Sequence, residues 1–139
     1  MDRKEFIINL SKSAAFVCAS CYLASCYGDE NNPAAPPQNV DFTIDISQSP
    51  YTALQNTGGS VYKDGLIIAR TGTNTFAALS QVCTHQGTTV QYEHSQSRMH
   101  CPNHGSNFKT DGTVINGPAA SPLKRYNTSL NGTMLRVFS

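Results

Sequence analysis

The chain has 139 residues, of which 39% are hydrophobic and 14% are charged, and its formal net charge is +1. This length allows one domain, and the composition is that of a globular protein rather than a disordered chain. A nearly neutral chain lacks the clustered excess of lysine and arginine that phosphate binding needs, so we expect no nucleic-acid partner.

Residues 1–25 have the organisation of an export signal. Arg3 and Lys4 precede a moderately apolar run that ends in small residues and is too short and too interrupted to span a membrane. Residues 23–26, LASC, resemble the lipobox of bacterial lipoproteins, where the chain is cut before a cysteine that is then lipidated. We therefore expect a signal peptide over residues 1–25 and lipid on Cys26. The alternative is an ordinary signal peptide that happens to contain this cysteine.

Residues 26–39 and 40–139 differ in composition. The first segment is rich in proline, asparagine and acidic residues, cannot bury much apolar surface, and is expected to form a flexible tether. The second segment begins with VDFTIDI, whose apolar residues alternate with polar ones at the two-residue period of a half-buried strand.

Short β-type runs continue from there to Ser139, and no amphipathic helical window exceeds two turns. The runs are VYKDGLIIAR, TFAALS, TTVQYE, TVINGP and YNTSLNGTMLRVF. The turn signals between and within them are Gly58-Gly59, Asp64-Gly65, Asp111-Gly112 and Asn131-Gly132. The sequence therefore predicts an all-β domain with a small core.

Two short stretches, VCTHQGTTV and HCPNHGSNF, hold four side chains of metal-ligand type. Two cysteines in an exported domain would normally form a disulfide, but a Cys83–Cys101 disulfide leaves His85 and His104 unexplained. Two thiolates and two imidazoles suit either a tetrahedral Zn²⁺ or a [2Fe–2S] cluster in which two histidines bind one iron. Each stretch contributes one cysteine and one histidine, which favours the cluster because each loop can then reach both irons.

The motifs CTHQG and CPNHGS resemble the two cluster-binding boxes of Rieske iron–sulfur proteins, and the similarity extends over most of residues 58–138. The resemblance implies a β-sandwich-like base that carries a small cluster-binding subdomain. It also implies a ligand set with Cys83 and Cys101 on the inner iron, and His85 and His104 on the outer, exposed iron.

Further roles follow from the same resemblance. Ser106 is expected to donate a hydrogen bond to a cluster sulfur. Gly117 and Pro118 begin the proline-containing loop 117–122 that is expected to cover the cluster, and its prolines would stiffen it.

The boxes also depart from those of the Rieske subunits of respiratory cytochrome bc complexes. Those subunits carry a further cysteine in each box, joined as a disulfide, where this chain has Thr88 and Asn103. They also place a tyrosine where this chain has Phe108. In these respects the boxes are more similar to those of Rieske-type ferredoxins and small reductase subunits.

These observations predict one-electron transfer by a Rieske-type [2Fe–2S] cluster, as a carrier or as a subunit of a redox complex in a bacterial cell envelope. The expected partner is a redox protein or a quinol-linked complex, and the expected location is the exported side of a membrane, through the lipid anchor. The chain is too short to add the mononuclear-iron domain of a Rieske oxygenase, so we do not expect an autonomous catalyst. The alternative is a non-redox module that holds Zn²⁺ in the same four ligands.

Overall fold

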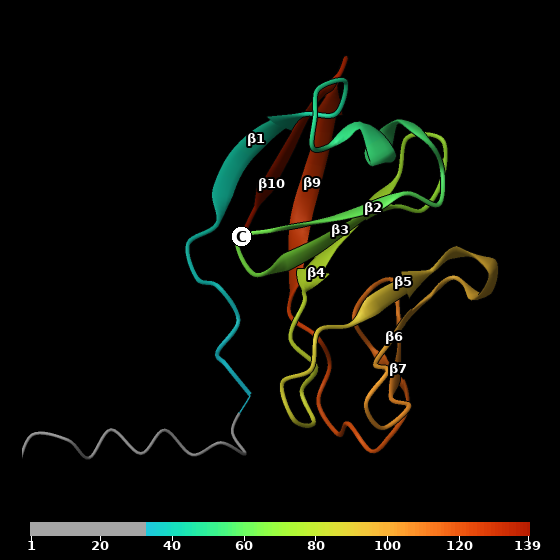
Figure 1. The fold of residues 1–139 in the computed structure, drawn as a ribbon. Helices are drawn as coiled ribbons and strands as arrows, with labels where there is room; N and C mark the ends of the chain where they lie inside the picture. Colours follow the sequence, from blue (N-terminus) through green and yellow to red (C-terminus); the bar gives the residue numbers. More distant parts are fainter. Residues whose placement is uncertain (1–32) are drawn as a thin grey trace, which may run out of the picture. The chain divides into compact units, whose positions relative to one another are not determined.

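The structure of this protein, a computed structural model, describes residues 33–139 and contains two antiparallel sheets (Figure 1). The expected signal peptide and Cys26 lie outside the described residues. In sheet order, the six-stranded sheet consists of β1 (Asp41–Asp45), β10 (Met134–Phe138), β9 (Arg125–Asn131), β4 (Phe76–Ser80), β3 (Leu66–Arg70) and β2 (Ser60–Lys63). The four-stranded sheet consists of β5 (Gln91–Glu93), β6 (Arg98–His100), β7 (Asn107–Lys109) and β8 (Val114–Asn116).

Two short 3-10 helices, η1 (Thr52–Gln55) and η2 (His94–Gln96), complete the regular structure of residues 33–139. Neither helix has the length or the apolar character that crossing a membrane requires. The predicted all-β fold is confirmed. Eight of the ten strands coincide with the β-type runs of the sequence, whereas β6 and β7 lie outside those runs. Asp64-Gly65 forms the turn of the β2–β3 hairpin, and Gly132-Thr133, one residue later than the predicted Asn131-Gly132, forms that of the β9–β10 hairpin.

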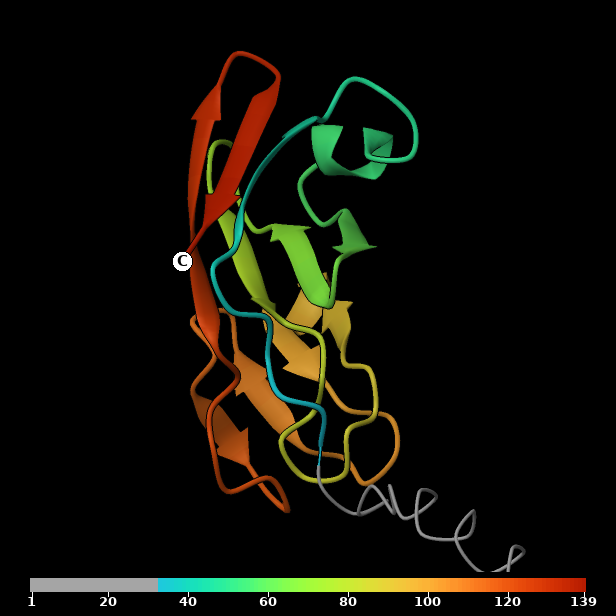
Figure 2. The same cartoon turned by 90° about the vertical axis from the view of Figure 1, so that its left-hand side faces the viewer.

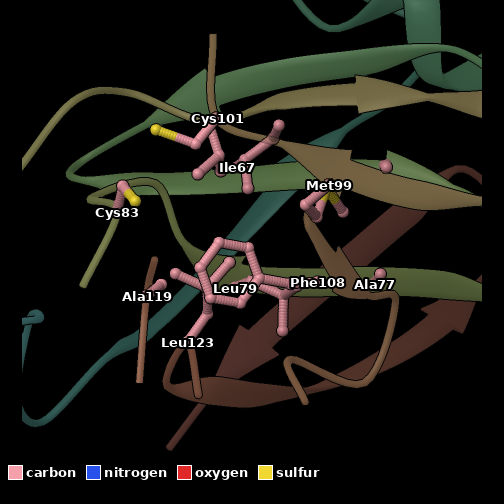
Figure 3. Close-up of a cluster of buried hydrophobic side chains, with 11 residues drawn as sticks. Ile67, Ala77, Leu79, Cys83, Met99, Cys101, Phe108, Ala119 and Leu123 are labelled. Atoms are coloured by element: carbon pink, nitrogen blue, oxygen red, sulfur yellow. The ribbon is translucent and has the colours of Figure 1, made fainter. Parts of the chain in front are cut away.

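The β3–β4 hairpin is buried on both faces, which explains why its sequence is apolar at nearly every position. Successive residues of a strand point to opposite faces, so Leu66 and Ile68 pack with β1, β9 and β10, whereas Ile67 packs toward the small sheet. The core cluster on the small-sheet side also contains Ala69, Ala77, Leu79, Cys83, Val90, Met99, Cys101, Phe108, Ala119 and Leu123. Figure 3 shows both cysteines at one side of this cluster.

Residues 33–39, which we expected to belong to a flexible tether, lie along the domain (Figure 2). The carbonyl oxygen of Pro37 accepts hydrogen bonds of 3.1 Å from Lys124 Nζ and 2.8 Å from the Tyr126 hydroxyl. Lys124 Nζ also donates to Gln38 Oε1 at 2.8 Å. Hydrogen bonds to Tyr126 on β9 and to Lys124 just before it therefore hold these residues against the domain, although the segment has no apolar core of its own.

Candidate metal centre

Three loops at one end of the domain contain the predicted site residues (Figures 1 and 2). The first loop, residues 82–90, joins β4 to β5 and carries Cys83 and His85. The second loop, residues 101–106, joins β6 to β7 and carries Cys101 and His104. The covering loop, residues 117–122, leads from β8 toward β9.

The backbone of the first loop turns tightly around its cysteine. Cys83 N–H donates a hydrogen bond of 2.8 Å to the carbonyl oxygen of Thr88, and Gly87 N–H donates one of 2.9 Å to the carbonyl oxygen of Cys83. Gly87 has a φ of +80°, a left-handed conformation that disfavours a residue with a Cβ atom.

The second loop repeats this hydrogen-bond pattern. Cys101 N–H donates to the carbonyl oxygen of Ser106 at 2.8 Å, and Gly105 N–H donates to that of Cys101 at 3.1 Å. Gly105, four residues after its cysteine as Gly87 is, has a φ of +79°. The two loops therefore present their cysteines in equivalent positions, although the histidine comes one residue later in the second loop.

The four predicted ligands differ in burial. The cysteines are both free thiols, with Cys83 0% and Cys101 2% exposed, whereas His85 is half-buried and His104 is exposed. The two imidazole rings lie 4.9 Å apart between centroids, at an interplanar angle of 84°. The site therefore places two sulfur donors inside and two nitrogen donors at the surface.

Burial raises the pKa of the Cys83 thiol above its ordinary value. The backbone N–H of His85 lowers this pKa, and the hydrogen-bonded thiol of Cys101 raises it. The raised pKa favours the neutral thiol of Cys83, so a metal that binds this sulfur must displace a proton.

Two hydrogen bonds attach the covering loop to the other two loops. The Oγ atom of Ser106, which is fully buried, accepts a hydrogen bond of 2.9 Å from Ala119 N–H. Thr84 Oγ1 in the first loop donates to the carbonyl oxygen of Ser121 at 2.6 Å. Gly117 and Pro118, at the start of the covering loop, are exposed.

A row of polar side chains, which the sequence patterns did not indicate, supports the second loop. His100 Nδ1 donates to Asn107 Oδ1 at 2.8 Å, and Asn107 Nδ2 donates to Asn116 Oδ1 at 2.8 Å. Asn107 Nδ2 and Asn116 Nδ2 also donate to the carbonyl oxygen of Gly105, at 3.1 and 3.0 Å. The three side chains come from β6, β7 and β8, so only the strand register could have revealed the row.

The donor set matches the ligands of a mixed-ligand two-iron cluster. Among residues 33–139, no group of three histidine, cysteine or acidic side chains is arranged to hold a metal ion. A mixed-ligand [2Fe–2S] cluster needs two thiolates for one iron and two imidazoles for the other. The two matching loops supply these four side chains.

Comparison with known proteins agrees with this donor set. The family model for the Rieske [2Fe-2S] domain matches residues 43–127, which include all four predicted ligands. This chain belongs to the Rieske [2Fe-2S] domain family. The family implies a Rieske-type [2Fe–2S] cluster as its cofactor.

Relatives of this Rieske protein include iron–sulfur subunits of cytochrome b6-f complexes. The subunit of Chlorobaculum thiosulfatiphilum is 36% identical over 108 residues, which cover 76% of this chain and 58% of the relative. The subunit of Chlorobaculum tepidum is 29% identical over 98 residues, which cover 68% of this chain and 54% of the relative. The chain thus spans little more than half the length of these curated relatives.

Solved structures show the same fold. The plasma membrane Rieske protein PetC3 from Synechocystis matches with a TM-score of 0.55 and 26% identity, over 63% of this chain and 93% of that one. The ferredoxin of carbazole 1,9a-dioxygenase from Nocardioides aromaticivorans matches with a TM-score of 0.52 and 19% identity, over 76% of this chain and 98% of that one. At 19% identity, the similarity to this ferredoxin shows a shared fold and nothing more.

Proposed function

We propose that this Rieske protein transfers single electrons through a [2Fe–2S] cluster bound by Cys83 and Cys101 on the inner iron and by His85 and His104 on the outer iron. The observation that carries the proposal is the difference in burial between the two thiols and the two imidazoles. When bound, such a cluster accepts and releases one electron, and its formal charge changes between zero and about −1. The protein acts as a carrier or as a subunit of a redox complex.

The imidazoles are the proposed contact with the redox partner. An iron-bound imidazole uses one ring nitrogen for the metal, and the other ring nitrogen is free to donate a hydrogen bond. His104 is exposed and His85 is half-buried, so both can be approached from outside the domain. A partner that docks on this end of the domain would therefore lie next to the outer iron.

The surface around the imidazoles favours an uncharged docking face on the partner. Residues 82–90, 101–108 and 117–123 contain no lysine, arginine, aspartate or glutamate. Ile115, beside the covering loop, is 51% exposed. Such a surface docks by apolar contact and imidazole hydrogen bonds rather than by ion pairs. This supports a membrane-embedded, quinol-linked complex as the partner, in keeping with the relatives named as b6-f complex subunits.

We further propose that lipid on Cys26 anchors the domain to a bacterial cell membrane, on the exported side. The support is the LASC motif at residues 23–26, together with the structural relative named as a plasma membrane Rieske protein. Pro33, the first of the described residues, lies beside Gly87 of the first loop: a Cβ atom on Gly87 would be 3.5 Å from Pro33 Cα.

EPR and visible absorption of the purified protein test the cluster proposal. We expect the wild type to show the EPR signal of a reduced [2Fe–2S] cluster and His85→Ala to lose it, because one iron then lacks a ligand. His94→Ala is the matched control, since His94 is exposed on η2 and contacts Tyr92. An unchanged spectrum for His85→Ala would remove His85 from the site. Bound zinc without any EPR signal in the wild type would favour the zinc-binding alternative.

A further inference from the structure

Asn116, the last residue of β8, joins the second loop to the covering loop through one side-chain amide. Its Nδ2 atom donates to the carbonyl oxygens of Gly105 and Gly117, both at 3.0 Å. Its Oδ1 atom accepts from Asn107 Nδ2 at 2.8 Å. Gly105 directly follows the predicted ligand His104, and Gly117 is the first residue of the covering loop.

Asn107 holds the Asn116 amide in this orientation. Asn107 is 7% exposed and lies opposite both His100 and Asn116 in the register of the small sheet. Its own amide is oriented by His100 Nδ1, and it supplies the second donor to the carbonyl oxygen of Gly105. That carbonyl oxygen therefore has both of its lone pairs engaged, which restrains the backbone next to His104.

Thr84 joins the first loop to the covering loop, because its hydroxyl group donates a hydrogen bond of 2.6 Å to the carbonyl oxygen of Ser121. Thr84 lies between Cys83 and His85 in the sequence. The covering loop is thus attached to the first loop by Thr84 and to the second loop by Asn116 and Ser106. Cys83 and Cys101 are the only cysteines among residues 33–139 and both are free, so these attachments within the described part of the chain are non-covalent.

We propose that Asn116 and Thr84 are positioning residues that join the first and second loops through the covering loop and so hold the two ligand histidines at a fixed separation. This hydrogen-bonded bridge performs the mechanical role of a covalent cross-link between the loops. This inference rests on the proposed cluster site. Neither residue is a ligand in it, so each acts through the loop that it restrains.

The test compares Asn116→Ala, Thr84→Val and the double variant in the cluster-loaded protein. The measurements are the rate of iron release to a chelator, the width of the EPR lines and hydrogen exchange at the Ala119 amide. Each single variant should release iron roughly tenfold faster, because it loses one or two hydrogen bonds that restrain the loops. Each should also broaden the EPR lines and speed exchange at Ala119. The double variant should release iron much more slowly than the product of the two effects predicts, because Thr84→Val by itself already removes the hydrogen bond that attaches the first loop to the bridge.

Matched controls separate this role from general destabilisation. Asn103→Ala and Thr89→Val make the same chemical changes at exposed positions of the second and first loops, and should stay within about twofold of the wild type. Thr84→Ser keeps the hydroxyl group and should retain the wild-type rate. Hydrogen exchange in β3 and β4 should be unchanged in all variants if the base sheet stays folded.

The outcomes distinguish this inference from the proposed function. A wild type without the reduced-cluster signal would overturn the proposed function and the inference with it. A wild-type cluster with unchanged iron release and EPR line width in both single variants would overturn the inference alone. Effects that multiply in the double variant would show two independent supports and no bridge between the first and second loops, which would also overturn it.

Discussion

The hydroxyl group of Ser106 accepts one hydrogen bond and is proposed to donate another to a cluster sulfur. Its Oγ atom already accepts a hydrogen bond from Ala119 N–H, and within residues 33–139 no acceptor takes the hydroxyl hydrogen. A hydroxyl group can accept and donate at the same time, so the hydrogen remains available for a cluster sulfur. Phe108, two residues later, is fully buried among apolar side chains and has no hydroxyl to add.

Replacing Ser106 by alanine should lower the reduction potential of the cluster. A hydrogen bond to a charged group contributes about 1.5–3 kcal/mol, and about 1.4 kcal/mol corresponds to 59 mV for one electron. If the hydrogen bond acts only on the reduced state, the potential should therefore fall by up to about 60–130 mV. Voltammetry measures the shift, and Ser95→Ala, at an exposed position of η2, is the control.

The reduction potential of the wild-type cluster also tests the role of the groups around it. Without a tyrosine hydroxyl or a disulfide at the boxes, it should lie below the upper end of the Rieske range of ~−150 to +300 mV. A wild-type value at the top of that range, or an unchanged potential in Ser106→Ala, would contradict the role given to these hydrogen bonds.

At the scale of the secondary-structure elements, two hairpin turns differ in how closely they pack against the rest of the domain. Gly112, between β7 and β8, has a φ of +94°, and a Cβ atom there would lie 2.4 Å from the carbonyl oxygen of Leu123. Leu123 N–H in turn donates to the carbonyl oxygen of Gly112 at 2.9 Å. Gly132, between β9 and β10, has a φ of +60° with no atom within 4 Å of such a Cβ.

These two glycines form a matched pair for mutation. Gly132→Ala should lower the free energy of unfolding by about 1 kcal/mol, the cost of a left-handed conformation. Gly112→Ala adds a clash with backbone and should cost more than about 3 kcal/mol. Denaturant unfolding of both variants measures the difference. Equal losses would show that the backbone at Leu123 moves aside at little cost.

At the scale of the whole molecule, the docked segment sets where the chain leaves the domain. Hydrogen bonds to Pro37 and Gln38 hold the segment against the domain, and Pro33 reaches the first loop. These residues cannot contribute to the reach of a tether while they are docked. A tether to the proposed anchor on Cys26 would therefore be shorter than residues 26–39.

Changing Cys26 to serine should release the protein from membranes and leave the cluster spectrum intact, because Cys26 is not one of the four proposed ligands. Fractionation of cells followed by a salt wash measures the release. The reduced-state EPR signal is the control for the cluster. A variant that stays in the washed membrane fraction, or that loses its cluster signal, would contradict the lipoprotein interpretation.

Strand and turn positions were readable from the sequence because they depend on neighbouring residues. The alternation in VDFTIDI predicted β1, which the structure confirms. The Asp64-Gly65 and Asn131-Gly132 pairs predicted two hairpin turns, and both hairpins form, the second with its turn one residue later at Gly132-Thr133. The four ligand-type side chains were also recognisable, since each pair lies within four residues along the chain.

Contacts between distant residues were decided only by the folded chain. Lys124 and Pro37 are 87 residues apart, so composition alone did not indicate the hydrogen bonds that residues 37 and 38 make with the domain. Nothing in the sequence distinguishes Asn107 and Asn116 from other strand residues. The strand register places both side chains beside the carbonyl oxygen of Gly105. Packing against β3 and β4 buries the two thiols and leaves the imidazoles outside. A hydrogen bond or a buried contact depends on distance and direction in space, and local sequence patterns do not contain these for residues far apart in the chain.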